Sequence, residues 1–342
     1  MKYQSKIEYR AYIDKTDGEL KATLKKGLDF IKWHKYIDKT SKVFVKPNFT
    51  FPYYKEGVTT NPEFLKSVLE LLKSRTDKVI LGESDGGNNS FRAEEAFQGH
   101  NMYEMCQELG VELVNLSTLP AKTIESEILG KTVKVKLPKI LLEEVDCFIS
   151  VPVLKVHVMT KVSLSLKNSW GCFPDTMRAL QHQNLSLKLA LIAKYLKPRI
   201  ILIDGTYALN KHGPMYGEPV NSNLVIVADN TVVADTIGAM VMGFLPQTIE
   251  HLVVAERAGL GSTDLETIEI NQDWQQYKRQ FQITKTLIDR ASSLLFRSDL
   301  LAKLVMDSPL TPLIYKVAGL LKTPDEKKIA SQIGRQRTLG LY

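Results

Sequence analysis

The sequence predicts an α/β protein with a mainly parallel, doubly wound sheet flanked by helices, followed by a C-terminal helical extension. Two observations support this fold class. The segments "VDCFISVP" (145–152) and "PRIILIDG" (198–205) are almost continuously apolar, which is typical of strands buried on both faces of a parallel sheet. Such segments alternate along the chain with helical segments, which is the order that successive βαβ units produce.

The expected elements follow from hydrophobic period and from turn residues. Residues 7–13 have the pattern of a strand, and apolar side chains recur at helical spacing over residues 19–34. Pro62 suits the first turn of a helix. Over residues 123–137, apolar and polar side chains alternate on both sides of a glycine, which predicts a β-hairpin. Further strands are expected at 42–45, 78–82, 111–116 and 223–229, and further helices at 91–110, 185–196 and 232–243.

The chain has 342 residues, which is enough for one large domain with an extension. We expect residues 1–261 to form the α/β domain that carries the functional site. Residues 262–342 are expected to form a mainly helical, basic extension. Its helices would begin at about Ile283 and be broken by Pro309 and Pro312.

The net positive charge of the chain is concentrated in this extension. Residues 278–342 contain 12 of the 45 Lys and Arg residues but only 5 of the 38 Asp and Glu residues, which accounts for the whole net charge of +7. An apolar stripe in the same segment leaves two interpretations open. The helices pack on the body with their charges in solvent, or they lie on an anionic membrane surface. We expect a cytoplasmic protein, peripheral at the membrane in the second case.

Several common functional classes lack their motifs here. Cys106, Cys147 and Cys172 are far apart and form no CxxC pair, so neither a disulfide framework nor an iron–sulfur cluster is expected. No GxGxxG, GxxxxGK[ST], GxSxG or HExxH motif supports dinucleotide, P-loop, serine-hydrolase or zinc-protease chemistry. Basic residues are not interleaved with aromatic ones, so nucleic-acid binding is not expected.

Polar side chains follow the ends of five expected strands. Because ligands bind outside the carboxyl ends of parallel strands, we expect these side chains to meet at one edge of the sheet. Each set alone is also compatible with a solvated turn or a helix cap; their convergence is the stronger argument. The sets are Lys46-Pro47-Asn48, Glu83-Ser84-Asp85, Lys155 with His157, Asp204-Gly205, and Asp229.

The segment "VPVLKVHVMTKVSLSLKNSWG" (151–171) carries an unusual number of donors for a buried region. If it remains extended, its ammonium, hydroxyl and imidazole groups lie on one face, where they can bind phosphate or carboxylate oxygens and move a proton near neutral pH. A lone histidine is more often structural, but His157 has several cationic neighbours. The residues on this expected face are Lys155, His157, Lys161, Ser163, Ser165 and Lys167.

Candidate roles follow from the chemistry of the residue types. Acid–base catalysis is assigned to His157, Lys155 and Asp204. A divalent metal such as Mg²⁺ is one option, because carboxylate oxygens are its preferred protein ligands; its expected ligands are Glu83, Asp85 and Asp235. The predicted substrate-binding residues are Lys46, Asn48, Thr59, Thr60, Lys167, Asn168, Arg178, His182 and Gly213.

Six segments resemble, in the right order, the signature blocks of the domain of unknown function 362 family. They are "VFVKPNF", "GVTTNPEF", "VILGESDGG", "ISVPVLKVHVMTKVSLSLKNSWG", "ILIDGTYALNKHGPMYGEP" and "VIVADNTVVADTIGAMVMG". The resemblance covers about residues 42–261 and implies an α/β domain but no reaction. Some members are joined to iron–sulfur modules, whose cysteine motifs this chain lacks. The positions that match the family pattern are Lys46, Asn48, Thr60, Lys155, His157, Lys167, Asn168, Gly171, Asp204, Gly213, Pro214 and Asp235.

These observations predict an enzyme that acts on a small anionic substrate, phosphorylated or carboxylated, with its reaction left open. One alternative is a non-catalytic module that binds a small anion. A redox or racemase-type enzyme is another. In each case the basic extension is a candidate for contact with a membrane surface.

Overall fold

The computed structural model describes residues 7–16, 18–287, 289–291, 298–306 and 308–309, together with residues 311, 314, 316 and 327. Its strands are β1 (Tyr9–Lys15), β2 (Val43–Lys46), β3 (Val79–Glu83), β4 (Glu112–Asn115), β5 (Ala121–Ile128), β6 (Lys131–Pro138), β7 (Cys147–Ser150), β8 (Val153–His157), β9 (Lys161–Ser163), β10 (Ile200–Asn210), β11 (Glu218–Ala228) and β12 (Ile268–Ile270). Its helices are α1 (Leu20–Phe30), α2 (Pro62–Lys73), α3 (Ala93–Gly99), α4 (Met102–Leu109), α5 (Lys139–Glu143), α6 (Ser165–Asn168), α7 (Leu185–Leu196), α8 (Thr231–Val241), α9 (Glu250–Arg257) and α11 (Asp299–Met306).

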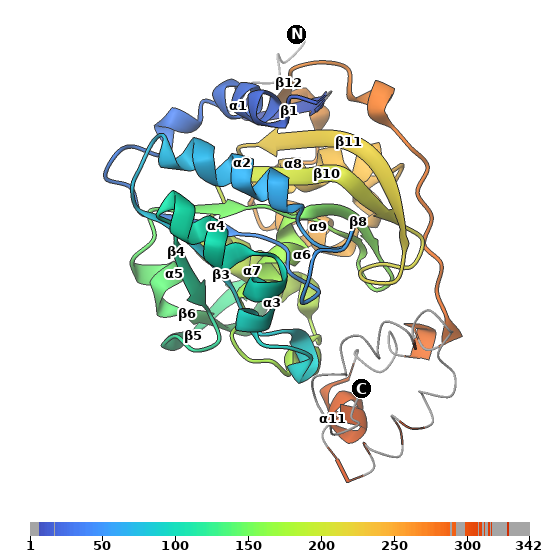
Figure 1. Cartoon of the computed structure of the whole chain (residues 1–342). Coiled ribbons are helices and arrows are strands. Elements are labelled where there is room, and N and C mark those ends of the chain that lie inside the picture. Colours follow the sequence, from blue (N-terminus) through green and yellow to red (C-terminus); the bar gives the residue numbers. More distant parts are fainter. Residues whose placement is uncertain are drawn as a thin grey trace.

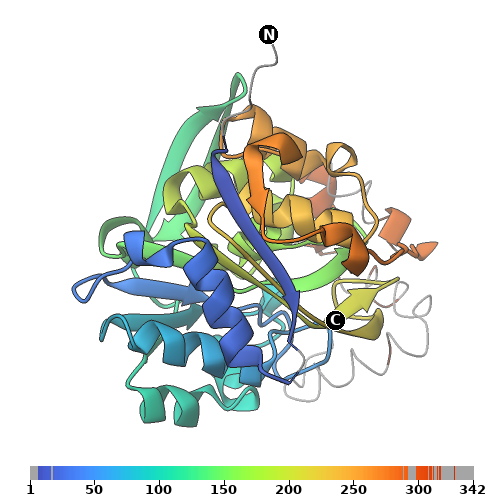
Figure 2. The same cartoon turned by 90° about the horizontal axis from the view of Figure 1, so that it is seen from above.

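One large sheet forms the centre of the protein (Figures 1 and 2). Its strand order is β12-β1-β11-β10-β7-β2-β3-β4, and the β8–β9 hairpin is attached to β10. The strands from β10 to β4 in this order are parallel, whereas β11 runs antiparallel to both β10 and β1. The predicted mainly parallel α/β fold is confirmed.

Helices cover both faces of the sheet, as Figure 1 shows. Alternate side chains of β2 point to opposite faces: Val43 and Val45 pack in the core with α1, α2 and α4, and Phe44 packs in the core with α7. Ile13 and Ile203 pack with α8 and α9 in a third cluster. Burial of each such side chain contributes about 1.5–3 kcal/mol, so the apolar strands of the sequence determine a two-sided sheet.

The sheet gathers the polar ends of its parallel strands at one edge. Asp229 does not join them as expected, because β11 is antiparallel to β10, and its carboxylate accepts the N–H of Arg10 at the opposite edge. In the register of β2 and β7, Lys46 lies opposite Ser150, and in that of β3 and β4, Glu83 lies opposite Asn115. The α2 helix begins at the same edge, where the Asn61 side chain accepts the backbone N–H groups of Glu63 and Phe64. The carboxyl edge of the sheet is thus built from residues distant in the chain.

Several elements differ in detail from the sequence prediction. Residues 91–110 form two helices, α3 and α4, because Asn101 between them adopts a left-handed φ of 58°. The strand predicted over 198–205 continues to Asn210 and forms a long hairpin with β11. Residues 151–171 are not extended throughout: β8 turns back into β9, and α6 follows. The hairpin predicted over 123–137 is confirmed as β5–β6.

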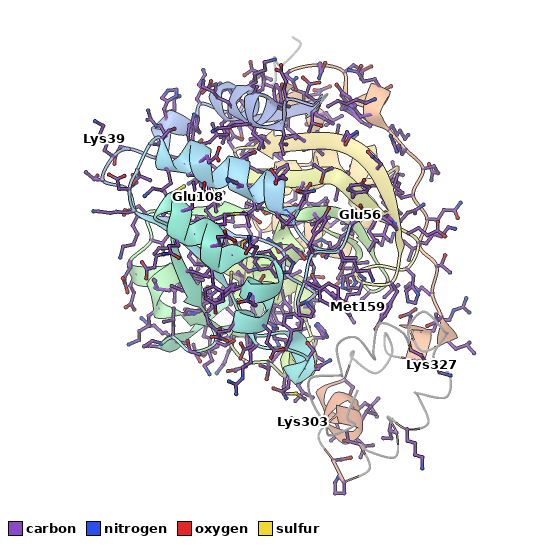
Figure 3. The ribbon with its side chains drawn as sticks, viewed as in Figure 1. Lys39, Glu56, Glu108, Met159, Lys303 and Lys327 are labelled. Atoms are coloured by element: carbon purple, nitrogen blue, oxygen red, sulfur yellow. The ribbon has the colours of Figure 1, made fainter. Side chains whose placement is uncertain are left out.

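The chain after residue 261 contains more than helices. β12 joins the sheet beside β1, so the sheet includes residues past the expected boundary. Farther along, α11 lies against the 3₁₀ turn η4 (Arg178–Gln181), and Figure 3 labels Lys303 on this helix. Pro312, one of the predicted helix breakers, lies outside the described residues. No helix in the described ranges is long and apolar enough to cross a membrane.

Candidate functional site

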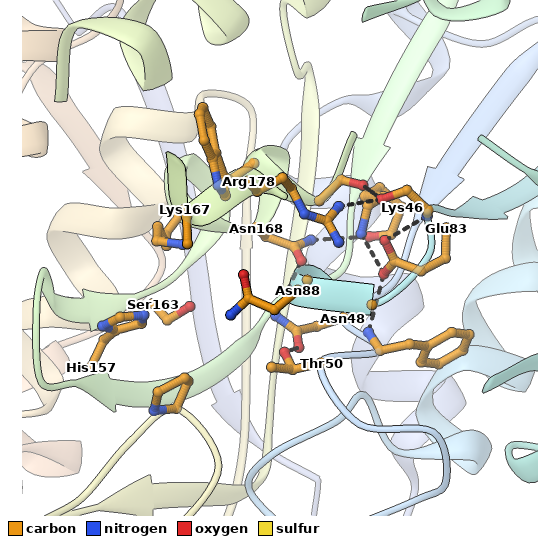
Figure 4. Close-up of a pocket in the computed structure, with 18 of the residues that line it drawn as sticks. Lys46, Asn48, Thr50, Glu83, Asn88, His157, Ser163, Lys167, Asn168 and Arg178 are labelled. Carbon is orange, nitrogen blue, oxygen red and sulfur yellow. Dashed lines mark hydrogen bonds and ion pairs between the residues drawn. The ribbon is translucent and has the colours of Figure 1, made fainter. Parts of the chain in front are cut away.

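A cavity of about 210 Å³, lined mainly by polar and charged residues, lies at the carboxyl edge of the sheet, which is the usual position of ligand sites in parallel α/β proteins. We call it the site cavity. Figure 4 shows Lys46 and Glu83 on one side of it, and His157 and Ser163 of the β8–β9 hairpin on the other. The predicted residues that line it are Lys46, Asn48, Glu83, His157, Lys167, Asn168, Arg178 and His182.

The Lys46–Glu83 ion pair forms one wall of the site cavity. Lys46 Nζ lies 2.6 Å from Glu83 Oε2, and both side chains are nearly inaccessible to solvent. Lys46 Nζ also donates to the carbonyl of Pro47, while Glu83 accepts the backbone N–H groups of Phe49 and Ser84. A buried ion pair is stable only when its remaining donors and acceptors are satisfied, as they are here.

Gly171 allows the chain to pass close to this ion pair. A Cβ atom at this position would lie 2.9 Å from Lys46 Nζ and 3.0 Å from Glu83 Oε1. Both atoms belong to a bonded pair, so neither can move away freely. Glycine is therefore the residue that fits, which explains "SWG" at the end of the donor-rich segment.

Lys155 lies beneath the site cavity and holds Asn48. Its Nζ donates to Asn48 Oδ1 at 3.0 Å, to Thr50 Oγ1 at 3.0 Å and to the carbonyl of Val58 at 2.6 Å. The side chain is fully buried, and burial, together with the nearby charges of Lys167 and Lys46, lowers the pKa of Lys155 well below its ordinary value. The structure thus gives Lys155 a positioning role and does not place it in the cavity wall.

Two asparagines and a threonine link the strand ends. Asn48 Nδ2 donates to Asn168 Oδ1 at 3.1 Å, and Asn168 Nδ2 donates to the Lys46 carbonyl and to Ser150 Oγ. Thr60 Oγ1 accepts the N–H of Asn48 and donates to the carbonyl of residue 151. This network fixes the two cavity-lining asparagines, because nearly every polar atom in it has a defined partner.

Lys167 is a charged residue of the site cavity that has neither a counterion nor a hydrogen-bond acceptor among the described residues. It lies on α6, and no hydrogen bond or ion pair involves its Nζ among the described residues. Burial, and then the charge of Arg178, lowers the pKa of Lys167 to about 8. An amine of this kind is partly deprotonated near neutral pH and is suited to proton transfer.

His157 faces the same cavity as a neutral ring. The backbone N–H of Met159 donates to His157 Nδ1 at 3.1 Å, so the ring proton is assigned to Nε2. Burial, followed by the charges of Lys167 and Lys155, lowers the pKa of His157 well below its ordinary value. The sequence assigned acid–base work to His157, whereas its surroundings favour a neutral hydrogen-bond donor.

Arg178, the first residue of η4, and His182, which follows its last residue, line the cavity. Arg178 donates to the Phe173 carbonyl at 3.0 Å and also to Ser84 Oγ and the Asp85 carbonyl, which anchors the loop after β3. The His182 ring stacks on Trp170 with centroids 6.0 Å apart. Burial, and then the charge of Lys167, lowers the pKa of His182 to about 3, so this ring is neutral.

The three predicted metal ligands do not converge. Glu83 pairs with Lys46. Asp85 Oδ1 accepts the N–H of Ala93 at the start of α3, and Asp235 accepts the N–H groups of residues 165 and 166 at 2.7 and 3.0 Å. Asp235 thereby caps α6 from α8, and its burial raises its pKa to about 7. No group of three or more His, Cys, Asp or Glu side chains is placed to hold a metal within the part of the chain that the structure describes.

Asp204, Thr59 and Gly213 also lie outside the cavity wall. Asp204 Oδ2 accepts the N–H of Asn61 at 2.7 Å and Oδ1 accepts from Thr206, so it supports the loop before α2; its burial raises its pKa. Thr59 Oγ1 accepts the N–H of Lys55. A Cβ at Gly213 would lie 1.8 Å from the carbonyl oxygen of residue 156, so glycine there lets the neighbouring proline reach the cavity.

Sequence reasoning gave no role to several lining residues. Thr50 links Asn48 to Lys155, and its signal, a hydroxyl two residues after "KPN", was too weak to recognise. Trp170 lines the cavity, and its buried Nε1 has no acceptor among the described residues. Asn88 has a left-handed φ of 57°, which the "GGNN" stretch could have indicated.

Comparison with known proteins identifies the family. The family model described as a domain of unknown function (DUF362) matches residues 43–240, more than half of the chain. The thylakoid-associated protein sll1697 of Synechocystis sp. (strain ATCC 27184 / PCC 6803 / Kazusa) is 25% identical over 240 residues, which cover 68% of this chain and 72% of that protein. No solved structure matched. The chain belongs to the DUF362 family.

Proposed function

We propose that this protein is an enzyme that binds a small anionic substrate, phosphorylated or carboxylated, in the site cavity. The observation that carries the proposal is Lys167, a cation with no counterion in a cavity where Lys46 is paired with Glu83 and Arg178 is bonded to carbonyl oxygens. Lys167 is only partly exposed to solvent, so its ammonium group is incompletely hydrated, and an incoming anion supplies the partner that it lacks.

The residues around Lys167 suit a developing negative charge. His157 offers an Nε2–H, and Trp170 offers an indole N–H that lacks an acceptor within the described residues. Fixed donors of this kind stabilise an oxyanion without having to reorganise. In this mechanism Lys167 accepts or returns the proton, while Lys155 and Asp204, expected from sequence to be catalytic, hold the loops that form the wall.

The main alternative is a module that binds an anion without chemistry, and racemase-type or redox enzymes remain further candidates. The pKa of about 8 for Lys167 favours an enzyme, because a lysine that only binds an anion has no need of a pKa near neutrality. Proton abstraction next to a carboxylate, as in racemisation, would use the same group. Redox chemistry would need a cofactor supplied from outside the described side chains.

A divalent cation has a place in this proposal as a companion of the substrate. The carboxylates predicted as ligands are engaged by Lys46 or by backbone N–H groups. A phosphorylated substrate brings its own oxygen ligands, and Mg²⁺ commonly enters proteins bound to them. We therefore place Mg²⁺, where the reaction uses it, on substrate phosphate.

A second property, peripheral membrane association, is favoured by the surface of α11. Leu300 is 78% exposed on this helix and Leu304 is 49% exposed, and Leu287, earlier in the C-terminal segment, is 75% exposed. Exposed leucines beside basic residues suit an anionic membrane surface. The name of the Synechocystis relative, thylakoid-associated, agrees with this location. We propose a cytoplasmic protein that reaches membranes through this segment.

The test is a screen of phosphorylated and carboxylated metabolites for conversion, followed by mass spectrometry. Wild type is compared with Lys167→Met and with the control Lys131→Met, which removes an exposed lysine from the β5–β6 hairpin. Conversion by wild type and the control but not by Lys167→Met supports the enzyme. Equal conversion by all three contradicts the role of Lys167, and binding without conversion supports the module.

A further inference from the structure

A second cavity, of about 550 Å³, adjoins the site cavity. His182 lines both cavities, so a molecule that passes this ring can occupy both. The second cavity lies between the β8–β9 turn, the first turns of α7 and α9, and Lys285. Met159 of that turn is labelled in Figure 3, on the side of the body toward the C-terminal segment.

Two helix N-termini meet at this second cavity. The α7 helix has 12 residues and α9 has 8, and neither N-cap residue, Asn184 or Ile249, makes a side-chain capping bond. The backbone N–H groups of Ser186, Glu250 and His251 have no acceptor within the described ranges. Free N–H groups and the helix dipole at such ends favour an anion.

The side chains of the second cavity supply further positive charge. Lys161 and Lys285 line it and make no ion pair with a described residue. The carboxylate of Glu250 also lines it and is exposed, so it opposes part of this charge. The positive charge of two lysines and two helix N-termini exceeds the negative charge of one solvated carboxylate. The electrostatic potential in the second cavity therefore favours an anion.

His251 gives the independent sign of a ligand. Its side chain is 1% exposed and lines the second cavity, yet its Nε2 is buried without a hydrogen-bond partner among the described residues. A buried polar atom left without a partner is costly, so it is normally satisfied by a ligand or water. Burial, and then the charge of Lys167, lowers the pKa of His251, as both also lower that of His157.

We propose that the second cavity binds a second anionic group of the same substrate, and that the substrate class is therefore a bis-anion, such as a bisphosphate or a phosphorylated carboxylate. This inference rests on the proposed function of the site cavity. One anionic group contacts Lys167, and the other contacts the first turns of α7 and α9 together with Lys161 and Lys285. The connecting part of the molecule passes His182.

The experiment is calorimetric titration of the full chain with sulfate and with a series of alkane-α,ω-bisphosphonates of increasing length. Sulfate is expected to bind twice per chain. One member of the series is expected to bind once per chain, at least tenfold more tightly than sulfate. The double variant Lys161→Met/Lys285→Met should lose this gain while one sulfate still binds with unchanged affinity.

The outcomes separate the two proposals. A bisphosphonate series that never binds more tightly than sulfate, or that is unaffected by the double variant, overturns the bis-anion inference and leaves the site cavity intact. Sulfate binding that is unchanged in Lys167→Met overturns the proposed function instead. The variant His251→Gln retains a side-chain donor and should keep part of the increase in bisphosphonate affinity. If His251→Leu, with both lysines present, binds the bisphosphonate as tightly as wild type, His251 is not part of the second site.

Discussion

Asp235 on α8 accepts the backbone N–H of Ser165, the first residue of α6, at a distance of 2.7 Å. Its second oxygen accepts the next N–H along the chain. Through this cap, a residue 70 positions away sets the direction of a four-residue helix that carries Lys167 and Asn168 into the site cavity. Asp235 thus acts on the site through α6.

Replacement of Asp235 should therefore damage the site without touching the ligand. We expect Asp235→Ala to lower the free energy of unfolding by about 2–4 kcal/mol, because two buried N–H groups lose their acceptor. Asp235→Asn keeps one acceptor oxygen and should lose about half as much. Urea unfolding measures both. Equal stability of Asp235→Ala and wild type would contradict the capping role.

The wall formed by Lys46 and Glu83 should tolerate no side chain at Gly171. In Gly171→Ala the new Cβ would lie 2.9 Å from Lys46 Nζ, so the ion pair must shift or the chain must move. We expect a loss of about 1–3 kcal/mol in stability and at least a fivefold loss in sulfate affinity. Thermal unfolding and calorimetry measure the two effects. An unchanged sulfate affinity in a folded variant would show that the wall can adapt.

Sulfate binding should depend on pH through Lys167. Sulfate keeps its charge between pH 6 and pH 9, and the ammonium form of Lys167 is the form that attracts it. The pKa of Lys167 is lowered to about 8, so affinity should be full well below pH 8 and fall as pH rises through that value. In Lys167→Arg, whose guanidinium stays charged, the profile should be flat. A wild-type profile as flat as that of the arginine variant would contradict this reasoning.

Removal of divalent metal should leave anion binding intact. The carboxylates expected to hold Mg²⁺ are engaged by protein donors, so the lysines supply the positive charge for the anion. We expect the same sulfate affinity before and after treatment with EDTA. Loss of binding on chelation, with recovery on addition of Mg²⁺, would show a metal in the anion site.

The part of the site that could be predicted from sequence is the part fixed by the sheet. Lys46 and Glu83 directly follow apolar strands, and parallel strands place such residues at one edge whatever the loops do. The donor-rich segment after β7 could likewise be assigned to this edge. These predictions depend only on the pattern of apolar residues that indicates a strand and on the order of strands and helices along the chain.

The orientation of residues beyond the strand ends could not be predicted. Lys155 and His157 alternate as expected, yet Lys155 meets the loop around Asn48 and is buried beneath the cavity. The continuous extended face expected for residues 155–167 is interrupted, because the chain turns after His157 and a cap from Asp235 starts α6. Such partners lie far away in sequence, so no local pattern reveals them.

The most direct test of the central claim is the dissociation constant of the sulfate in the site cavity for wild type and for Lys167→Met at pH 7. It is measured by calorimetry in the Lys161→Met/Lys285→Met background, with Lys131→Met as the control. A hydrogen bond to a charged group contributes about 1.5–3 kcal/mol, so we predict at least a tenfold weaker constant in Lys167→Met and no change in the control. The unliganded variant should be about as stable as wild type, because Lys167 is partly exposed and makes no ion pair with a described residue that the substitution would break. Sulfate that binds Lys167→Met as tightly as wild type would contradict the central claim.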